Sequence, residues 1–88
     1  MTAPTPLIAG NWKMNGLAAS LAEAKAVADG IGGTSARVAI CPPAILIHRM
    51  TQALAGRAVL VGGQDHHWDD SGAFTGDVSA EMLSLIHI

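Results

Sequence analysis

Short, continuously apolar segments alternate with segments of helical period, and this alternation most limits what the chain can fold into. Leu7–Asn11, Arg37–Cys41 and Ala58–Val61 have the length and hydrophobic character of buried strands. The longer segments Leu17–Ile31 and Ala44–Leu54 carry apolar residues every three or four positions, as one face of a helix does. Strands joined by helices predict an α/β fold with a parallel sheet and right-handed crossovers.

Turn-forming residues set the ends of these segments. A cluster of glycines ends the first helix, and Pro42-Pro43 closes the second strand but can open the following helix. Residues 62–78 are rich in Gly, Asp and His and predict a long loop, after which Ser79 can cap a third helix. The buried face of the first helix is expected to comprise Leu17, Leu21, Ala24, Ala28 and Ile31.

Composition narrows the possible functions. A chain of 88 residues corresponds to one small domain or to part of a larger one. A net charge of −2 argues against nucleic-acid binding, and no apolar run approaches the about 18–20 residues that span a membrane. The single cysteine excludes an internal disulfide and favours a cytoplasmic location. Sixteen alanines predict a thin core.

Polar residues follow each predicted strand at its carboxyl end, where α/β proteins place their functional groups, so residues 11–16, 41–43 and 64–77 are the segments predicted to carry chemistry. Asn11 and Lys13 lie directly after the first strand, within the segment 11–16, and could face one anionic ligand. Lysine supplies a point charge for a phosphate or an oxyanion, and asparagine donates hydrogen bonds without titrating. A solvated loop with an exposed lysine is the alternative interpretation.

Four segments carry a resemblance to a known family. In chain order they are Ala9-Gly-Asn-Trp-Lys-Met-Asn-Gly16, Ile40-Cys-Pro-Pro43, Gly62-Gly-Gln-Asp65 and Ser71-Gly-Ala-Phe-Thr-Gly-Asp-Val-Ser-Ala-Glu-Met-Leu83. They resemble the first, second and third strand ends, and the third loop with its helix, of triosephosphate isomerase. The resemblance covers residues 1–82 and implies the N-terminal three βα units of a TIM (β/α)8 barrel. With three of eight strands the barrel would not be closed.

The resemblance implies an enzyme that interconverts dihydroxyacetone phosphate and glyceraldehyde 3-phosphate through an enediolate, in glycolysis and gluconeogenesis, without cofactor or metal. Asn11 and Lys13 match the family's substrate-binding and catalytic asparagine and lysine. The family, a standard example of acid–base tuning, also uses a glutamate base, a histidine electrophile and a closing loop. Neither Glu23 nor Glu81 matches the base, and no histidine here matches the electrophile. We therefore expect the 88-residue chain alone to be inactive.

The same resemblance implies a homodimer in the full-length protein. The loop before the third helix would enter a pocket of the partner subunit, where Thr75 would brace the partner's Asn11. Asp77 stands where the family commonly has glutamate, so its ion-pair partner could differ. A mobile loop tip is the alternative. The residues expected at the interface are Met14, Phe74, Thr75 and Gly76.

Other residues have weaker interpretations. The run Asp65–Asp70 contains two histidines and three carboxylates, but adjacent residues of an extended loop point apart, which argues against one shared metal ion. Cys41 is interpreted as a buried, inert thiol, Trp12 and Trp68 as packing anchors, and His48 as a surface residue. Two other functions remain open at this point: a small module that holds an anion near Lys13 without catalysis, and a metal-binding or structural domain.

The last six residues, Leu-Ser-Leu-Ile-His-Ile, depart from the family and show no helical period. The DNA sequence CTG-TCT-CTT-ATA-CAC-ATC encodes these six residues, and it looks like the end of a common transposase sequencing adapter. We therefore expect residues 83–88, or 84–88 if Leu83 is native, to be a non-native tail after the partial barrel of residues 1–82. A frameshift or a divergent terminus is the alternative.

Overall fold

The computed structural model describes residues 3–86, and the last two residues of the expected tail lie outside this range. The strands and helices follow the predicted order, and the first two strands have the predicted bounds. The third strand starts one residue later than expected. The elements are β1 (Leu7–Asn11), the 3-10 helix η1 (Ala18–Ser20), α1 (Leu21–Gly30), β2 (Arg37–Cys41), α2 (Ala44–Ala53), β3 (Val59–Val61) and α3 (Ala80–Leu85).

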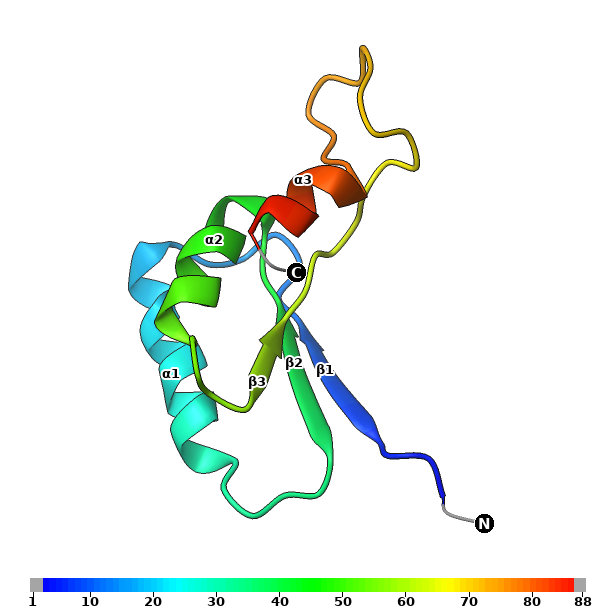
Figure 1. The fold of residues 1–88 in the computed structure, drawn as a ribbon. Helices are drawn as coiled ribbons and strands as arrows, with labels where there is room; N and C mark the ends of the chain where they lie inside the picture. Colours follow the sequence, from blue (N-terminus) through cyan, green and yellow to red (C-terminus); the bar gives the residue numbers. More distant parts are fainter. Residues whose placement is uncertain (1–2, 87–88) are drawn as a thin grey trace.

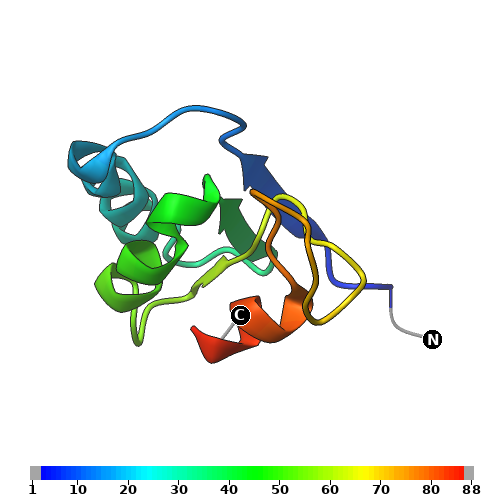
Figure 2. The same cartoon turned by 90° about the horizontal axis from the view of Figure 1, so that it is seen from above.

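The three strands form one parallel sheet in the order β1-β2-β3, so the α/β prediction is confirmed. In the register, Ala9 pairs with Ala39, which pairs with Leu60. Helices α1 and α2 lie side by side on one side of the sheet (Figures 1 and 2). All three strands point the same way, so their carboxyl ends lie together at one end of the sheet. The chain between β3 and α3 projects beyond this end (Figure 1).

The core lies between the sheet and the two long helices. Helix α1 contributes one fully buried residue, Ala24, because its buried face consists largely of small side chains. Leu17 was expected on that face, but it precedes η1 and is 75% exposed, so this part of the prediction is wrong. Helix α2 contributes three buried side chains, Leu46, Ile47 and Met50. The central cluster comprises Ala24, Ile40, Met50, Leu54 and Val59.

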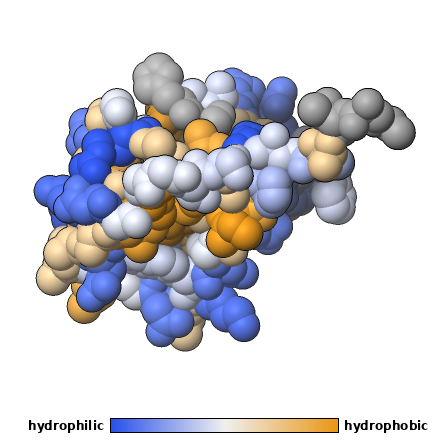
Figure 3. Space-filling model, turned by 90° about the horizontal axis from the view of Figure 1, so that it is seen from below, coloured by the Kyte–Doolittle hydropathy of each residue, from blue (hydrophilic) through white to orange (hydrophobic). Residues whose placement is uncertain are grey.

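The sheet is open at both edges. Every residue of β1 is exposed, so the prediction of a buried strand is wrong for β1. Parallel sheets normally have both faces covered by helices. Here α1 and α2 lie on one face of the sheet, and no strand within residues 3–86 pairs with the free edge of β1. Hydrophobic residues reach the surface at the centre of the face seen in Figure 3. Within the described residues, none of the helices has the length and apolar character of a membrane span.

Helix α3 begins as predicted and extends further than predicted. The Ser79 hydroxyl accepts a hydrogen bond from the Met82 backbone N–H at 3.1 Å, which caps the helix. The helix continues through Leu85 and so includes half of the expected tail. Leu83 is 8% exposed, and a Cβ added to Gly63 would lie 3.0 Å from its Cδ1. Residues 83–85 are therefore helical although the sequence there shows no helical period, and Leu83 packs against Gly63 just after β3.

Candidate functional site

The three segments predicted to carry chemistry meet at the carboxyl edge of the sheet. The Trp12 backbone N–H donates to the Cys41 carbonyl at 3.1 Å, which extends the β1–β2 pairing by one step. The Gln64 side chain reaches back from the chain after β3. Its Nε2 donates to the Lys13 carbonyl at 2.8 Å and to the Cys41 carbonyl at 3.0 Å. One amide thus joins the ends of all three strands.

Lys13 has an unusual backbone conformation. Its φ of 55° makes it the one non-glycine residue with positive φ among those described. A side chain in this left-handed region costs about 1–2 kcal/mol, so other contacts must hold it there. One such contact is the hydrogen bond from the Lys13 N–H to Asn11 Oδ1 at 2.8 Å. Asn11 and Lys13 therefore form one short, locally closed turn directly after β1.

The polar groups of this turn are available to a ligand. Asn11 and Lys13 are both exposed, and the Lys13 ammonium makes no ion pair with any residue in the range 3–86. Asn11 uses Oδ1 for the turn, and its Nδ2 protons have no partner among the same residues. The arrangement therefore offers one positive charge and one neutral donor, which suits an anionic, oxygen-rich ligand.

Trp12 lies between these two residues and fixes the turn to the core. Its side chain is half-buried against the central cluster, so the packing role expected for it is confirmed. Gly16 approaches the indole so closely that a Cβ there would lie 3.0 Å from Trp12 Cε3 and 3.1 Å from Leu46 Cδ1. Asn15 Nδ2 donates to the Trp12 carbonyl at 3.0 Å, which closes the turn on its other side.

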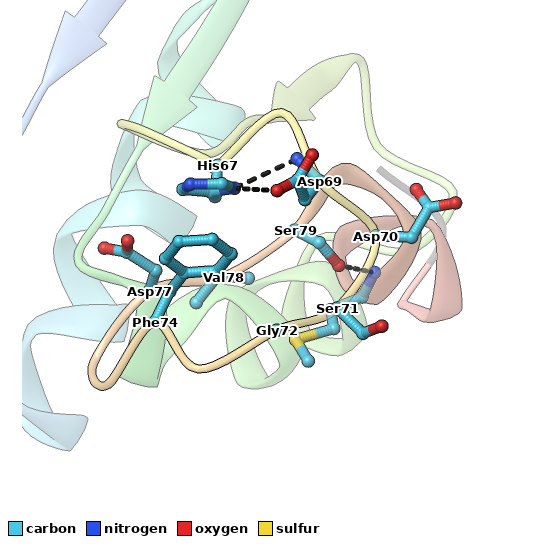
Figure 4. Close-up of a pocket in the computed structure, with 10 residues that line it drawn as sticks. His67, Asp69, Asp70, Ser71, Gly72, Phe74, Asp77, Val78 and Ser79 are labelled. Carbon is cyan, nitrogen blue, oxygen red and sulfur yellow. Dashed lines mark hydrogen bonds and ion pairs between the residues drawn. The ribbon is translucent and has the colours of Figure 1, made fainter.

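The long loop before α3 is organised around His67 (Figure 4). The imidazole stacks on Phe74 with ring centroids 3.8 Å apart, and on Trp68 at 4.7 Å. Its Nδ1 accepts a hydrogen bond from the Asp69 N–H at 3.0 Å. The His67 backbone N–H donates to the Val78 carbonyl at 2.8 Å, which ties the two ends of the loop together.

These contacts separate the two adjacent histidines. His66 directs Nδ1 at the His67 carbonyl, 3.1 Å away, whereas the His67 ring lies in the aromatic stack. In the part of the chain that the structure describes, no group of three or more His, Cys, Asp or Glu side chains is placed to hold a metal ion. The cavity next to His67 measures only about 30 Å³.

The loop tip presents the residues expected at a subunit interface. The Asp77 N–H donates to the Phe74 carbonyl at 3.0 Å, and Gly76, with φ of 89°, supplies the positive φ that this tight turn needs. Thr75 and Gly76 are exposed, and Phe74 remains 42% exposed despite its stacking. Met14, in the turn after β1, is 95% exposed.

Three minor predictions have mixed outcomes. Trp68 is 85% exposed, so the prediction that it anchors packing is wrong: one face of its ring meets His67 and the rest is bare. Cys41 is a free cysteine and only half-buried, less than expected. His48 lies on the exposed face of α2, as predicted.

Comparisons with known proteins agree with this geometry. The family described as "Triosephosphate isomerase" matches residues 6–88. The triosephosphate isomerase of Caulobacter vibrioides is 60% identical over 85 residues, covering 94% of this chain and 34% of the relative. That of Xanthobacter flavus is 56% identical over 78 residues, covering 89% and 31%. The crystal structure of triosephosphate isomerase from Bartonella henselae superposes with a TM-score of 0.88 at 48% identity, covering 94% of this chain and 35% of that one.

The chain thus spans about a third of the length of the relatives it matches. Within this third, the parallel strands and the turn after β1 coincide with an extended sequence match, and the solved structure confirms the predicted partial TIM barrel. This chain belongs to the triosephosphate isomerase family.

Proposed function

We propose that this chain is the N-terminal third of a cytoplasmic triosephosphate isomerase, which interconverts dihydroxyacetone phosphate and glyceraldehyde 3-phosphate through an enediolate. The observation that carries the proposal is the turn after β1. In this turn the Asn11 side chain accepts a hydrogen bond from the Lys13 backbone N–H, and the Lys13 ammonium makes no ion pair within residues 3–86. The substrate pair requires this chemistry, because each member has a phosphate and a carbonyl or hydroxyl oxygen.

The two side chains have complementary roles in the proposed reaction. The Lys13 ammonium neutralises part of the phosphate charge and of the negative charge that develops on the enediolate oxygen. A donor fixed in place before the reaction stabilises such charge without reorganisation. Asn11 Nδ2 donates to a substrate oxygen and stays neutral at every working pH, so it holds the substrate without competing for its protons.

Proton transfer requires residues beyond these two. A general base must lie within hydrogen-bond reach of the carbon-bound proton, next to Lys13. The candidates on this chain are placed elsewhere: Glu23 is on α1 and Glu81 is on α3, and both are exposed. We propose that the base, the electrophile and the phosphate-binding loops belong to the two thirds of the relatives' length that this chain does not span. The 88-residue chain alone is then inactive.

The proposed enzyme works as a homodimer. The loop tip, with Phe74, Thr75 and Gly76, would insert beside Met14 of the partner subunit. Support comes from the exposure of these residues and from the hydrogen-bonded turn at the tip. An apolar ring at the end of a projecting loop is expected to bury its open face against a partner.

A hybrid enzyme tests the proposal. Residues 1–82 of this chain replace the matching segment of the Bartonella henselae isomerase, which supplies the rest of the barrel. We expect the hybrid to isomerise dihydroxyacetone phosphate, and Lys13→Met to reduce kcat/KM by about 100-fold or more, as the loss of a charged stabilising group does. The matched control is Lys25→Met, which removes an exposed lysine of α1 and should leave the rate unchanged. A folded hybrid without activity contradicts the proposal.

The alternative function, an anion-binding module without catalysis, rests on the same turn. It predicts that inorganic phosphate raises the Tm of the 88-residue chain and that Lys13→Met abolishes this effect. An inactive hybrid together with phosphate stabilisation would favour this alternative.

We also propose that the terminal residues do not belong to the parent's natural sequence. The packing of Leu83 against Gly63 supports the narrower boundary, residues 84–88. Reading the source DNA across codons 80–100 tests this. A frame that continues into further helix residues supports a non-native tail, whereas an encoded tail followed by a stop codon contradicts it.

A further inference from the structure

Gln64 contacts the turn after β1 but has no assigned role in the proposed reaction. It follows β3 after two glycines, and the Gly62 N–H donates to the Ile40 carbonyl at 2.9 Å, which anchors this segment on β2. From there the Gln64 side chain donates to the carbonyls of Lys13 and Cys41, at 2.8 and 3.0 Å. Both protons of one amide group are thus committed to backbone oxygens of two other strand ends.

The bond to Lys13 matters because of the backbone conformation of this residue. Asn11 Oδ1 accepts from the Lys13 N–H, and Gln64 Nε2 donates to the Lys13 carbonyl, so side chains hold both backbone polar groups of Lys13. A non-glycine residue keeps a φ of 55° only when its surroundings fix it. If the carbonyl is released, the Lys13 backbone can relax to negative φ, which changes the direction in which its side chain leaves the turn.

We infer that Gln64 is a positioning residue, which holds the Lys13 backbone in the left-handed conformation and so directs its ammonium at the substrate. The role of the ammonium rests on the proposed function, whereas the conformational effect does not. An amide is required, because it offers two protons to two carbonyls. An ionised carboxylate would offer none, and leucine, of similar size, has no polar group.

The conformational effect can be measured on the 88-residue chain by NMR. A residue with positive φ gives an intense NOE between its own amide and α protons. We expect this intense signal at Lys13 in the unmodified chain and a markedly weaker one, typical of negative φ, in Gln64→Leu. Gln52→Leu, on the exposed face of α2, is the matched control and should keep the signal. Absence of the signal in the unmodified chain, or its persistence in Gln64→Leu, overturns the inference.

The functional effect can be measured in the hybrid enzyme. We expect Gln64→Leu to lower kcat/KM about tenfold, because the bond that holds the Lys13 carbonyl is lost while the rest of the site stays intact, and Gln52→Leu to leave it unchanged. Lys13→Met should lower kcat/KM by a smaller factor in the Gln64→Leu hybrid than in the unmodified hybrid, because both substitutions remove the same oriented charge. Full additivity would show that Gln64 acts independently of Lys13 and would refute its positioning role. An inactive hybrid with a normal NMR result would refute the proposed function alone.

Discussion

Replacing Met50 by alanine should remove a large part of the stability of this chain. Met50 is 0% exposed and lies at the centre of the core, where α1, α2 and the sheet meet. The substitution deletes three heavy atoms beyond Cβ. At about 0.8 kcal/mol for each buried methylene-sized group, the transfer contribution is about 2.4 kcal/mol. The cavity left between Ala24, Ile40 and Val59 raises the expected loss to about 3–4 kcal/mol.

The assay is urea unfolding of the 88-residue chain, followed by tryptophan fluorescence. Trp12 packs against the core and reports unfolding, whereas Trp68 is 85% exposed in the fold and contributes a nearly constant background. Met14→Ala is the matched control, because Met14 is 95% exposed and its truncation should change the free energy of unfolding by less than about 0.5 kcal/mol. A loss below about 1 kcal/mol in Met50→Ala, or equal losses in both variants, would refute the assignment of the core.

Three other predictions address the loop, the third helix and activity. Gly72→Ala should displace the Phe74 ring, because a Cβ at Gly72 would clash with it. The chain has one phenylalanine, so the NMR signals of its ring report the displacement directly, and unchanged signals would contradict the loop geometry. Ser79→Ala should destabilise α3 by about 1 kcal/mol, because the hydrogen bond from the Met82 N–H to the Ser79 hydroxyl is lost, and amide hydrogen exchange in α3 should become faster. Ser84→Ala, at an exposed position, should leave the exchange unchanged, and similar exchange in both variants would argue against the cap. The purified 88-residue chain should show no isomerisation in a coupled assay, and measurable turnover would disprove the need for the rest of the barrel.

Local sequence predicted the regular elements closely. Arg37–Cys41 is bounded by a polar turn on one side and by two prolines on the other, so both of its ends are fixed by residues next to it. The cap at Ser79 is equally local, since donor and acceptor are three residues apart. The start of the first helix was placed too early, because Leu17 continues the apolar period although the chain there is still extended.

The site was predicted in part. The segments after the three strands were expected to meet, and the resemblance singled out Asn11 and Lys13. The segment that begins at Gln64 was expected to carry functional residues, but the two hydrogen bonds that the Gln64 side chain makes to the other strand ends were not predicted. The burial of Leu83 was missed for a related reason: its packing site is Gly63, twenty residues earlier in the chain.

The sequence by itself determined the order of strands and helices, the placement of polar groups at strand ends and the family, because these depend on period, turn residues and contiguous motifs. Only the tertiary structure decided that Gln64 joins three strand ends, that His67 stacks on Phe74 and leaves Trp68 exposed, and that Leu83 packs against Gly63. The contacts of Gln64 depend on the distance between segments far apart in the chain, which is set by how the helices pack on the sheet. The stacking of His67 on Phe74 depends on how the loop before α3 closes on itself, and no local pattern encodes either distance.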